Sequence, residues 1–253
     1  MSKPFKTTID NGIAELVFDH LPVNAFDSAG WASIAAEIEA LGNDERVRVI
    51  VIAAEGRGFC AGVDIKELAA DGSLITAVNK GNYDSFKAIH RNPKPVIVAV
   101  HGFVLGGGIG ISGAADIIVA SDCARFGVPE VDRGAMGGGA HLARMFPVQK
   151  VRHMYFTGEM IDAAEAYRLG AVERVVPREA LRETALGIAA RIAGKSPRMI
   201  RLAKEALTGV EDGDLEAKYR WEQGFTLEAY SSNDSQEARD AFVEKRDAAF
   251  QSA

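Results

Sequence analysis

Cysteine is scarce in this sequence. Only Cys60 and Cys123 occur among 253 residues, which excludes a disulfide framework and fits a chain kept in a reducing compartment. We expect both thiols simply to pack in the fold, because free cysteine is among the residues most often found buried.

Long apolar runs and a surplus of basic charge are also missing. The longest apolar runs have the length of strands, and residues 1–10 lack the apolar core of a signal peptide. We therefore expect a cytoplasmic protein that does not bind membranes. The formal net charge is −6 and is spread along the chain, so no nucleic-acid partner is expected.

The chain does have enough apolar sequence for a large core, with 47% hydrophobic and 25% charged residues, as is typical of a globular protein. Residues 12–18 alternate in polarity as a strand does, and a helical pattern runs from Ser28 to about Leu41. Three near-continuous apolar runs predict buried strands at residues 47–54, 95–100 and 117–120.

The two ends of the chain differ in pattern, which predicts an α/β fold with a helical C-terminal part. From about Asp162 onward the sequence is rich in alanine, leucine and charged residues at helical spacing. No low-complexity linker separates the parts. We expect a core over residues 1–195 and a helical region over residues 196–253, within one folded unit.

Glycine is concentrated in three stretches, residues 56–62, 106–113 and 134–139. Glycine costs backbone entropy, so such stretches persist where the chain turns tightly or where a ligand approaches the main chain. Tight strand-to-helix turns remain the alternative for any single stretch.

Gly108, Gly110 and Gly113 match the GxGxxG pattern of dinucleotide sites. The helix that should follow is too short, because only two alanines precede Asp116 and the next predicted strand. We therefore expect neither a nicotinamide nor a flavin cofactor.

A helix beginning near Gly107 offers a better use for these glycines. Its first backbone N–H groups are unpaired and its dipole favours negative charge. A second donor could come from residues 56–64, which precede another helical segment beginning near Ile65. Two converging N–H groups would stabilise a developing enolate oxygen.

Three motifs coincide with these features: GFCAGVDIKE at residues 58–67, GFVLGGG at residues 102–108 and FGVPE at residues 126–130. With PVNA at residues 22–25 and AFVEKR at residues 241–246, they resemble the crotonase superfamily, which includes enoyl-CoA hydratases and isomerases. Their order and spacing fit that family over nearly the whole chain.

The resemblance implies a crotonase-type (ClpP-like) spiral of ββα units, followed by C-terminal helices that assemble homotrimers, commonly paired into hexamers. It implies an acyl-CoA substrate, with coenzyme A as part of that substrate and no tightly bound cofactor. The N–H groups of Val63 and Gly107 would form the oxyanion hole. The expected coenzyme A site consists of Val23, Ala25, Ala61, Val63, Asp64, Ile65, Lys66, Phe242 and Lys245. For the two lysines, a solvated surface position is the alternative.

A hydratase of this family uses two glutamates, and only one is present here. Glu130 of the FGVPE motif matches the second, whereas Gly110 occupies the position of the first and cannot transfer a proton. Loss of one acid–base group typically costs about 100- to 10,000-fold in rate, so efficient hydration of a simple enoyl thioester is not expected. Glu130 is the main catalytic candidate, and surface pairing with Arg133 is its alternative.

Further segments resemble the actinobacterial steroid-ring hydrolases of this superfamily: PEVDRGA at residues 129–135, His141–Leu142 and RWEQGFT at residues 220–226. The implied reaction is hydrolytic ring opening of a cyclic β-oxoacyl-CoA, in which water attacks the ketone and the leaving carbanion is held as the thioester enolate. In this hypothesis Glu130 activates water or returns a proton, and the space left at Gly110 admits a bulky ring.

Two further residues near this site have open roles. His141 could polarise the ketone or orient water, and a satisfied, partly buried histidine is an equal alternative. For Asp132, structural pairing with its neighbour Arg133 is preferred to catalysis.

Other functions remain open. A single carboxylate also suits an enoyl-CoA isomerase, and a β-oxidation hydratase could recruit Asp132 or Glu159 in place of Gly110. A non-catalytic acyl-CoA or RNA-binding relative is the third alternative. The histidines show no metal-ligand spacing, so no metal is expected.

Overall fold

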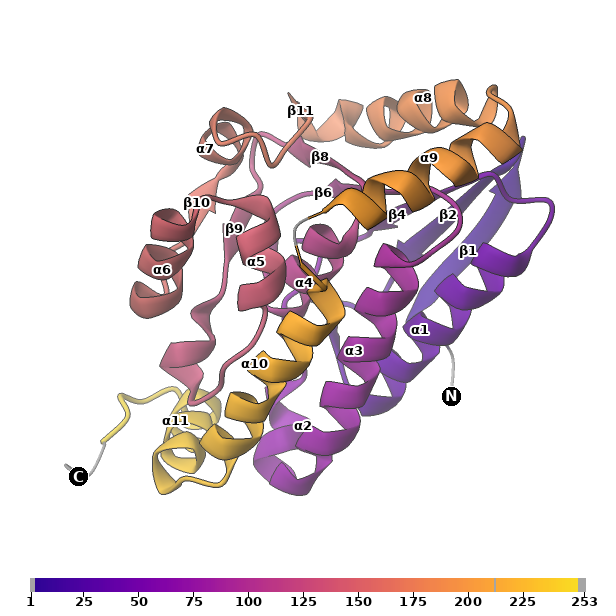
Figure 1. Cartoon of the computed structure of the whole chain (residues 1–253). Helices are drawn as coiled ribbons and strands as arrows, with labels where there is room; N and C mark the ends of the chain where they lie inside the picture. The colour runs from indigo at the N-terminus through magenta and orange to yellow at the C-terminus, as the bar shows by residue number, and fades with distance from the viewer. Residues whose placement is uncertain (1–2, 212, 250–253) are drawn as a thin grey trace.

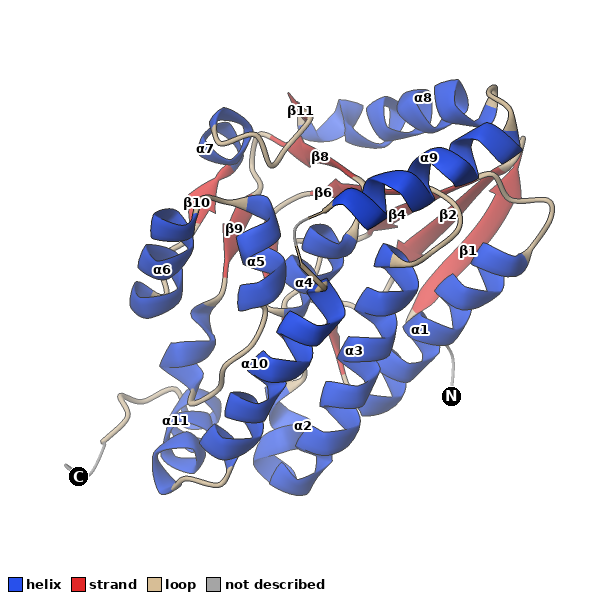
Figure 2. Ribbon diagram, in the orientation of Figure 1, coloured by secondary structure: helices blue, strands red, loops and turns tan. Residues whose placement is uncertain are grey.

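The computed structural model of the chain describes residues 3–211 and 213–249, and its central layer is a six-stranded sheet (Figures 1 and 2). The strand order is β1-β2-β4-β6-β8-β11. β1 (Phe5–Asp10) pairs antiparallel with β2 (Ile13–Phe18). The remaining neighbours are parallel, and these strands are β4 (Val49–Ala54), β6 (Val96–Val100), β8 (Ile117–Ser121) and β11 (Arg174–Val176).

Strand β4 explains why the predicted strands carry so few polar residues. All six of its residues are buried. Ile50 and Ile52 belong to the core on one face of the sheet, whereas Val49 and Val51 belong to the core on the other. Successive side chains of a strand point to opposite faces, so a strand covered on both sides is apolar throughout. Helix α8 (Leu181–Ala193) covers the second face.

Helices α1 (Ser28–Asn43) and α3 (Ile75–His90) pack against each other on the first face. Asp27 caps α1, because its carboxylate accepts a hydrogen bond from Gly30 N at 2.6 Å. Trp31 of α1 and Phe86 of α3 lie in the same core, with ring centroids 5.8 Å apart.

Short strands follow the long ones and form two smaller sheets. β7 (Phe103–Leu105), β9 (Arg125–Gly127) and β10 (Ile161–Asp162) form one, and β3 (Ala25–Phe26) and β5 (Gly62–Val63) form the other. The order long strand, short strand, helix recurs in β4, β5 and α2 (Ile65–Ala70), and again in β6, β7 and α4 (Gly107–Ala114). Each turn of this spiral therefore ends at the start of a helix.

The C-terminal helices return across these helix starts (Figure 1). α10 (Leu215–Tyr230) contacts α3 and α5 (Gly139–Met145), and α11 (Asn233–Glu244) contacts α2. The other helices of this half are α6 (Val148–Thr157), α7 (Ala163–Arg168) and α9 (Pro197–Val210). Among the described residues, no helix has both the length and the apolar character needed to cross a membrane.

The predicted strands and helices are found within a few residues of their expected bounds. The helical pattern after Asp162 is interrupted by β11, which pairs with β8, and it begins where β10 ends. The expectation that both cysteines pack is wrong for Cys123, which is exposed in the turn after β8, whereas Cys60 is buried.

Candidate active site

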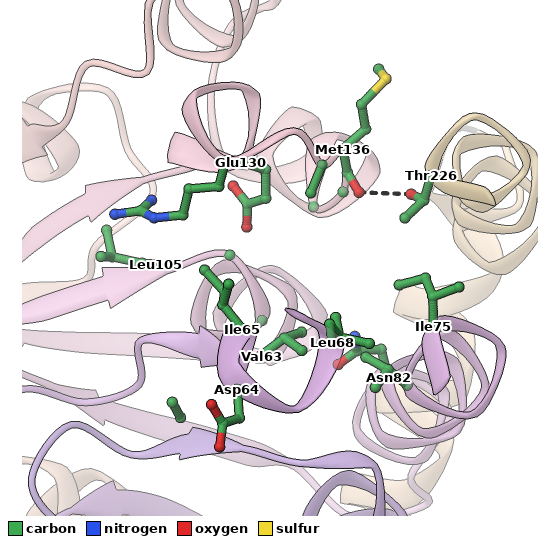
Figure 3. Close-up of a pocket in the computed structure, with 18 of the residues that line it drawn as sticks. Val63, Asp64, Ile65, Leu68, Ile75, Asn82, Leu105, Glu130, Met136 and Thr226 are labelled. Atoms are coloured by element: carbon green, nitrogen blue, oxygen red, sulfur yellow. Dashed lines mark hydrogen bonds between the residues drawn. The ribbon is translucent and has the colours of Figure 1, made fainter. Parts of the chain in front are cut away.

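A cavity of about 320 Å³ opens where the helix starts and the C-terminal helices meet (Figure 3). Its walls come from the starts of α2 and α4, one side of α3, residues 129–138, and the cavity-facing sides of α10 and α11. Most of the residues expected to bind substrate or perform catalysis line it: Val23, Ala25, Ala61, Val63, Asp64, Ile65, Lys66, Gly107, Glu130 and Phe242.

Lys245 is not among the residues that line this cavity. It lies at the C-terminal end of α11 in a left-handed backbone conformation, with φ of 58°. The structure therefore brings Phe242 to the cavity without Lys245.

The two loops predicted to supply the oxyanion hole meet at their main chains. A Cβ atom added to Gly62 would lie 3.3 Å from Gly107 N, and one added to Gly107 would lie 2.5 Å from the Trp31 ring. Gly106 has φ of 50°, which favours glycine. Gly110 N is bonded to Gly106 O at 3.0 Å, and the N–H groups before it at the start of α4 have no partner within the helix. Glycine here permits backbone contact that a side chain would block.

Asp64 fixes the other loop. Its carboxylate accepts a hydrogen bond from Lys66 N at 3.0 Å and so caps α2. Its backbone N–H donates to Phe26 O at 2.9 Å. Asp64 therefore holds the turn that places Val63 at the cavity wall.

The carboxyl group of Glu130 lies beside the start of α4. A Cβ atom at Gly106 would overlap Oε1 of Glu130, and Figure 3 shows the carboxyl pointing into the cavity toward Ile65 and Val63. The Oε2 atom is buried and has no hydrogen-bond partner among the described residues. Burial raises the pKa of Glu130 to about 8, so this group can hold or release a proton near neutral pH.

Arg133 also lines the cavity, but it does not pair as expected. Its guanidinium donates to Pro129 O at 3.2 Å and lies over the Phe242 ring, 4.8 Å from the centroid. It forms no ion pair with Glu130 or Asp132 in the part of the chain that the structure describes. The pairing predicted for Arg133 is therefore wrong, and its charge remains available at the cavity.

The two acids considered as substitutes at Gly110 lie elsewhere. Asp132 is exposed, and a Cβ atom at Gly158 would meet its carboxylate at 2.5 Å. Glu159 pairs with the exposed His153 at 2.8 Å. Neither acid lines the cavity.

Aromatic side chains fill the space beside Gly110. A Cβ atom there would overlap the ring of Phe86, which contacts His141 and Tyr219 at centroid distances of 4.8 and 5.3 Å. The prediction that Gly110 makes room for a substrate ring is therefore corrected, because Phe86 occupies that room. Phe86 and Tyr219 themselves line the cavity.

His141 is not brought to the cavity. It is 2% exposed and packs behind Phe86 and Tyr219, and its Nδ1 atom has no partner among the described residues. Burial lowers the pKa of His141 to about 3, so the imidazole is neutral in the folded protein. His141 is thus packed away from the cavity, but it is more deeply buried than the partly buried histidine of the alternative, and its Nδ1 atom is not satisfied.

The other GxGxxG glycines also serve packing. A Cβ atom at Gly108 would lie 2.8 Å from Cys60 O, and one at Gly113 would lie 2.5 Å from His141 O. Helix α4 ends at Ala114. The glycines let the segment at Cys60 and helix α5 approach α4 closely.

Helix α10 anchors the glycine-rich segment at residues 134–140. Glu222 accepts hydrogen bonds from Gly139 N at 2.6 Å and Ala140 N at 3.0 Å. Thr226 donates to Met136 O at 2.6 Å (Figure 3). The segment RWEQGFT thus holds one cavity wall in place, a role that the sequence did not indicate.

Two asparagines of α3 were also missed. Asn79 and Asn82 line the cavity, one turn apart on a helix face that is otherwise apolar. Amides among apolar residues at helical spacing are the signal that could have revealed them. Among the described residues, no cluster of three or more histidine, cysteine or acidic side chains could hold a metal ion.

Comparison with known proteins decides the family. Residues 8–253 match the sequence model of the enoyl-CoA hydratase/isomerase family. The chain belongs to the enoyl-CoA hydratase/isomerase family. It is therefore an acyl-CoA enzyme, and the predicted crotonase fold is confirmed.

Relatives and solved structures agree with this assignment. The chain is 48% identical over 241 residues to a (7aS)-7a-methyl-1,5-dioxo-2,3,5,6,7,7a-hexahydro-1H-indene-carboxyl-CoA hydrolase of Rhodococcus jostii, covering 94% of this chain and 93% of that one. The enzyme of the same name in Mycobacterium tuberculosis is 44% identical over 94% of this chain and 98% of its own. An enoyl-CoA hydratase/isomerase structure from Pseudoalteromonas atlantica has a TM-score of 0.87 at 26% identity, with 98% and 100% of the two chains covered. The predicted resemblance to ring-opening hydrolases is confirmed.

Proposed function

We propose that this enzyme opens the ring of a cyclic β-oxoacyl-CoA by hydrolysis of a carbon–carbon bond. The observation that carries the proposal is the asymmetry at α4: Glu130 is beside Gly106, while Phe86 fills the place beside Gly110. One carboxyl group beside an oxyanion hole suffices for this reaction, because the thioester enolate is the electron sink. The hydrolase relatives support the same reaction class.

The proposed steps balance with water as the only co-reactant. The carboxylate of Glu130 takes a proton from water, whose oxygen bonds to the ring ketone carbon. The bond between that carbon and the α-carbon then breaks, and its electron pair forms the thioester enolate, held by the N–H groups of Val63 and Gly107. Glu130 returns the proton to the α-carbon, which leaves a ring-opened acyl-CoA with a new carboxyl group.

Coenzyme A would lie along the loop of Val63 and Asp64. Lys66 and Arg133 line the cavity with positive charge, which suits the phosphates of coenzyme A. Phe242, under the Arg133 guanidinium, offers an apolar surface beside them.

The reaction is tested by incubating the purified enzyme with a cyclic β-oxoacyl-CoA in heavy-oxygen water. We expect the product to gain the mass of one water, with the label in the new carboxyl group. Crotonyl-CoA is the second arm, because efficient hydration there would support a β-oxidation hydratase. Double-bond migration in an enoyl-CoA, with no ring opening, would support an isomerase.

We infer further that the C-terminal helices join copies of the chain as a homotrimer or hexamer. Leu207, Val210 and Trp221 are large apolar side chains of α9 and α10 that are 66%, 77% and 74% exposed. Exposed apolar groups mark an interaction surface where they form a contiguous patch, and these three lie on two helices that are consecutive in the chain. Light scattering should give the mass of three or six chains, and the mass of one chain would contradict the inference.

A further inference from the structure

The side of α3 presents two amides to the cavity. Asn79 and Asn82 are three residues apart, so their side chains are neighbours on the helix surface. Figure 3 places Asn82 on the side of the cavity where Leu68 and Ile75 lie, with Glu130 on the other side. The amide of Asn82 is therefore separated from the proposed reacting carboxyl by the space of the cavity.

Both amides are buried without being satisfied by the protein. Asn79 is 8% exposed and Asn82 is 6% exposed. Asn79 Nδ2 and Asn82 Oδ1 have no hydrogen-bond partner among the described residues. A buried polar group without a partner costs about 1–3 kcal/mol, and native proteins contain few of them. Such a pair at a binding cavity indicates that the ligand supplies the partner.

The helix that carries the pair is tied to α10 at Asn79. The backbone carbonyl oxygen of Asn79 accepts a hydrogen bond from Gln223 Nε2 of α10 at 2.7 Å. The remaining cavity-facing side chains of α3 are apolar, and they are Ile75, Val78 and Phe86. A few fixed polar groups in an apolar pocket set the orientation of a ligand.

We propose that Asn79 and Asn82 recognise a second oxygen of the acyl ring, a ketone or its enol, remote from the thioester. The inference rests on the proposed ring-opening function and names the class of its substrate. A ketone oxygen can accept from Asn79 Nδ2, whereas the hydroxyl of its enol accepts from Asn79 Nδ2 and also donates to Asn82 Oδ1, so that the enol satisfies both unpaired atoms. The apolar residues around the pair match a neutral ring rather than a charged chain.

The test pairs two substrates with substitutions that keep the side-chain volume. Two bicyclic β-oxoacyl-CoA esters are used, which differ only in a ketone remote from the thioester. We expect Asn82→Leu and Asn79→Leu to lower kcat/KM about 10- to 100-fold for the ester with the ketone. The ester without it should change less than about 3-fold. Asn79→Asp, which keeps the shape but removes the Nδ2 donor, should give the same selective loss.

Thermal unfolding separates recognition from a structural role. Leucine removes an unsatisfied amide, so the Tm of the free enzyme should stay the same or rise in both leucine variants. Asn43→Leu, on the exposed end of α1, is the matched control. Equal losses on both esters, or a fall in Tm with loss of both activities, would overturn the inference.

Measuring how tightly each ester binds shows whether this inference or the proposed function has failed. The Kd of each ester is measured by calorimetry in a Glu130→Gln background, where turnover is suppressed. If wild-type enzyme opens neither ring, the proposed function fails, yet a ketone-dependent Kd that is lost in Asn82→Leu would still support the amide site. If the enzyme opens the ring of both esters and no variant distinguishes them, the proposed function is supported and the proposed role of Asn79 and Asn82 is contradicted.

Discussion

The two sides of the α4 start differ sharply, although both border the same cavity. On one side the carboxyl of Glu130 touches Gly106, and burial raises its pKa to about 8. On the other side Gly110 is covered by Phe86, behind which His141 and Tyr219 pack. One side can transfer protons at neutral pH, and the other is a dry aromatic wall.

The difference shows that glycine at position 110 leaves no empty space, because the ring of Phe86 lies against it. A glycine alone would leave a void, and voids in a core are costly. Here the ring of Phe86 fills that space and becomes part of the cavity wall. The start of α4 therefore has a buried carboxyl on one side and an aromatic wall on the other.

The largest effect is expected from removal of the carboxyl itself. Glu130→Gln should lower kcat for ring opening about 100- to 10,000-fold, because the amide cannot take a proton from water. KM should change little, since the side chain keeps its shape. Steady-state kinetics on a cyclic β-oxoacyl-CoA checks this, with Glu159→Gln and Asp132→Asn as matched controls that retain activity. A loss below 10-fold in Glu130→Gln would place the proton transfer elsewhere.

Next in size is an attempt to restore the missing acid. Gly110→Glu should not create an efficient hydratase, because the new side chain overlaps Phe86. Overpacking and an unpaired buried carboxyl should together lower the free energy of unfolding by about 2–5 kcal/mol. Urea unfolding measures this, and crotonyl-CoA hydration measures activity.

A double variant tests the cause of that loss. Gly110→Glu combined with Phe86→Ala should recover part of the lost stability, because the overlapping ring is removed, and Phe86→Ala alone provides the reference for the cycle. Purely additive effects would show that Phe86 is not what excludes the glutamate.

The placement of Glu130 near the start of α4 could be predicted from the sequence. The packing of Phe86 against Gly110 could not. The motifs around Val63, Gly107 and Glu130 place backbone donors and a carboxyl at helix and strand ends, where local rules apply. Phe86 reaches Gly110 only through the packing of α3 on α4, a tertiary contact with no local pattern. The hypothesis that Gly110 leaves room for a substrate ring was wrong. The sequence shows that no side chain is present at position 110, but it does not show which neighbouring side chain fills that space.

The same limit applies to the polar residues missed on the cavity walls. Glu222 and Thr226 lie in a segment that the sequence singled out, but their hydrogen bonds join α10 to residues about 80 to 90 positions earlier. Asn79 and Asn82 lie on a helix whose pattern was not recognised. His141 follows a glycine stretch as catalytic groups often do, yet it packs against two rings.

A smaller effect is expected on stability as a function of pH. Below pH 4.5 the carboxyl of Glu130 is protonated in both the folded and the unfolded chain. Between pH 4.5 and about 8 the unfolded chain loses this proton while the folded chain keeps it, so stability falls as pH rises; above about 8 the penalty is constant.

Glu130→Gln removes that penalty. Its free energy of unfolding should exceed that of the wild type by an amount that grows from pH 4.5 to about 8 and then levels off. Urea unfolding across this pH range checks the curve, with Glu159→Gln as the exposed control. A difference that is independent of pH would mean that the carboxyl is not buried in its neutral form.

The smallest effect is expected from the aromatic side. His141→Leu keeps an apolar side chain of similar size against Phe86 and Tyr219, and removes an imidazole whose pKa is lowered to about 3 by burial. A group that is neutral throughout the working range contributes no ionisation to a pH–rate profile measured between about pH 5 and 9. We therefore expect kcat/KM to change less than about 3-fold and the profile to keep its shape. A fall in kcat/KM of more than 100-fold with an unchanged Tm would show that His141 reaches the substrate. Both sides of the α4 start would then take part in the reaction.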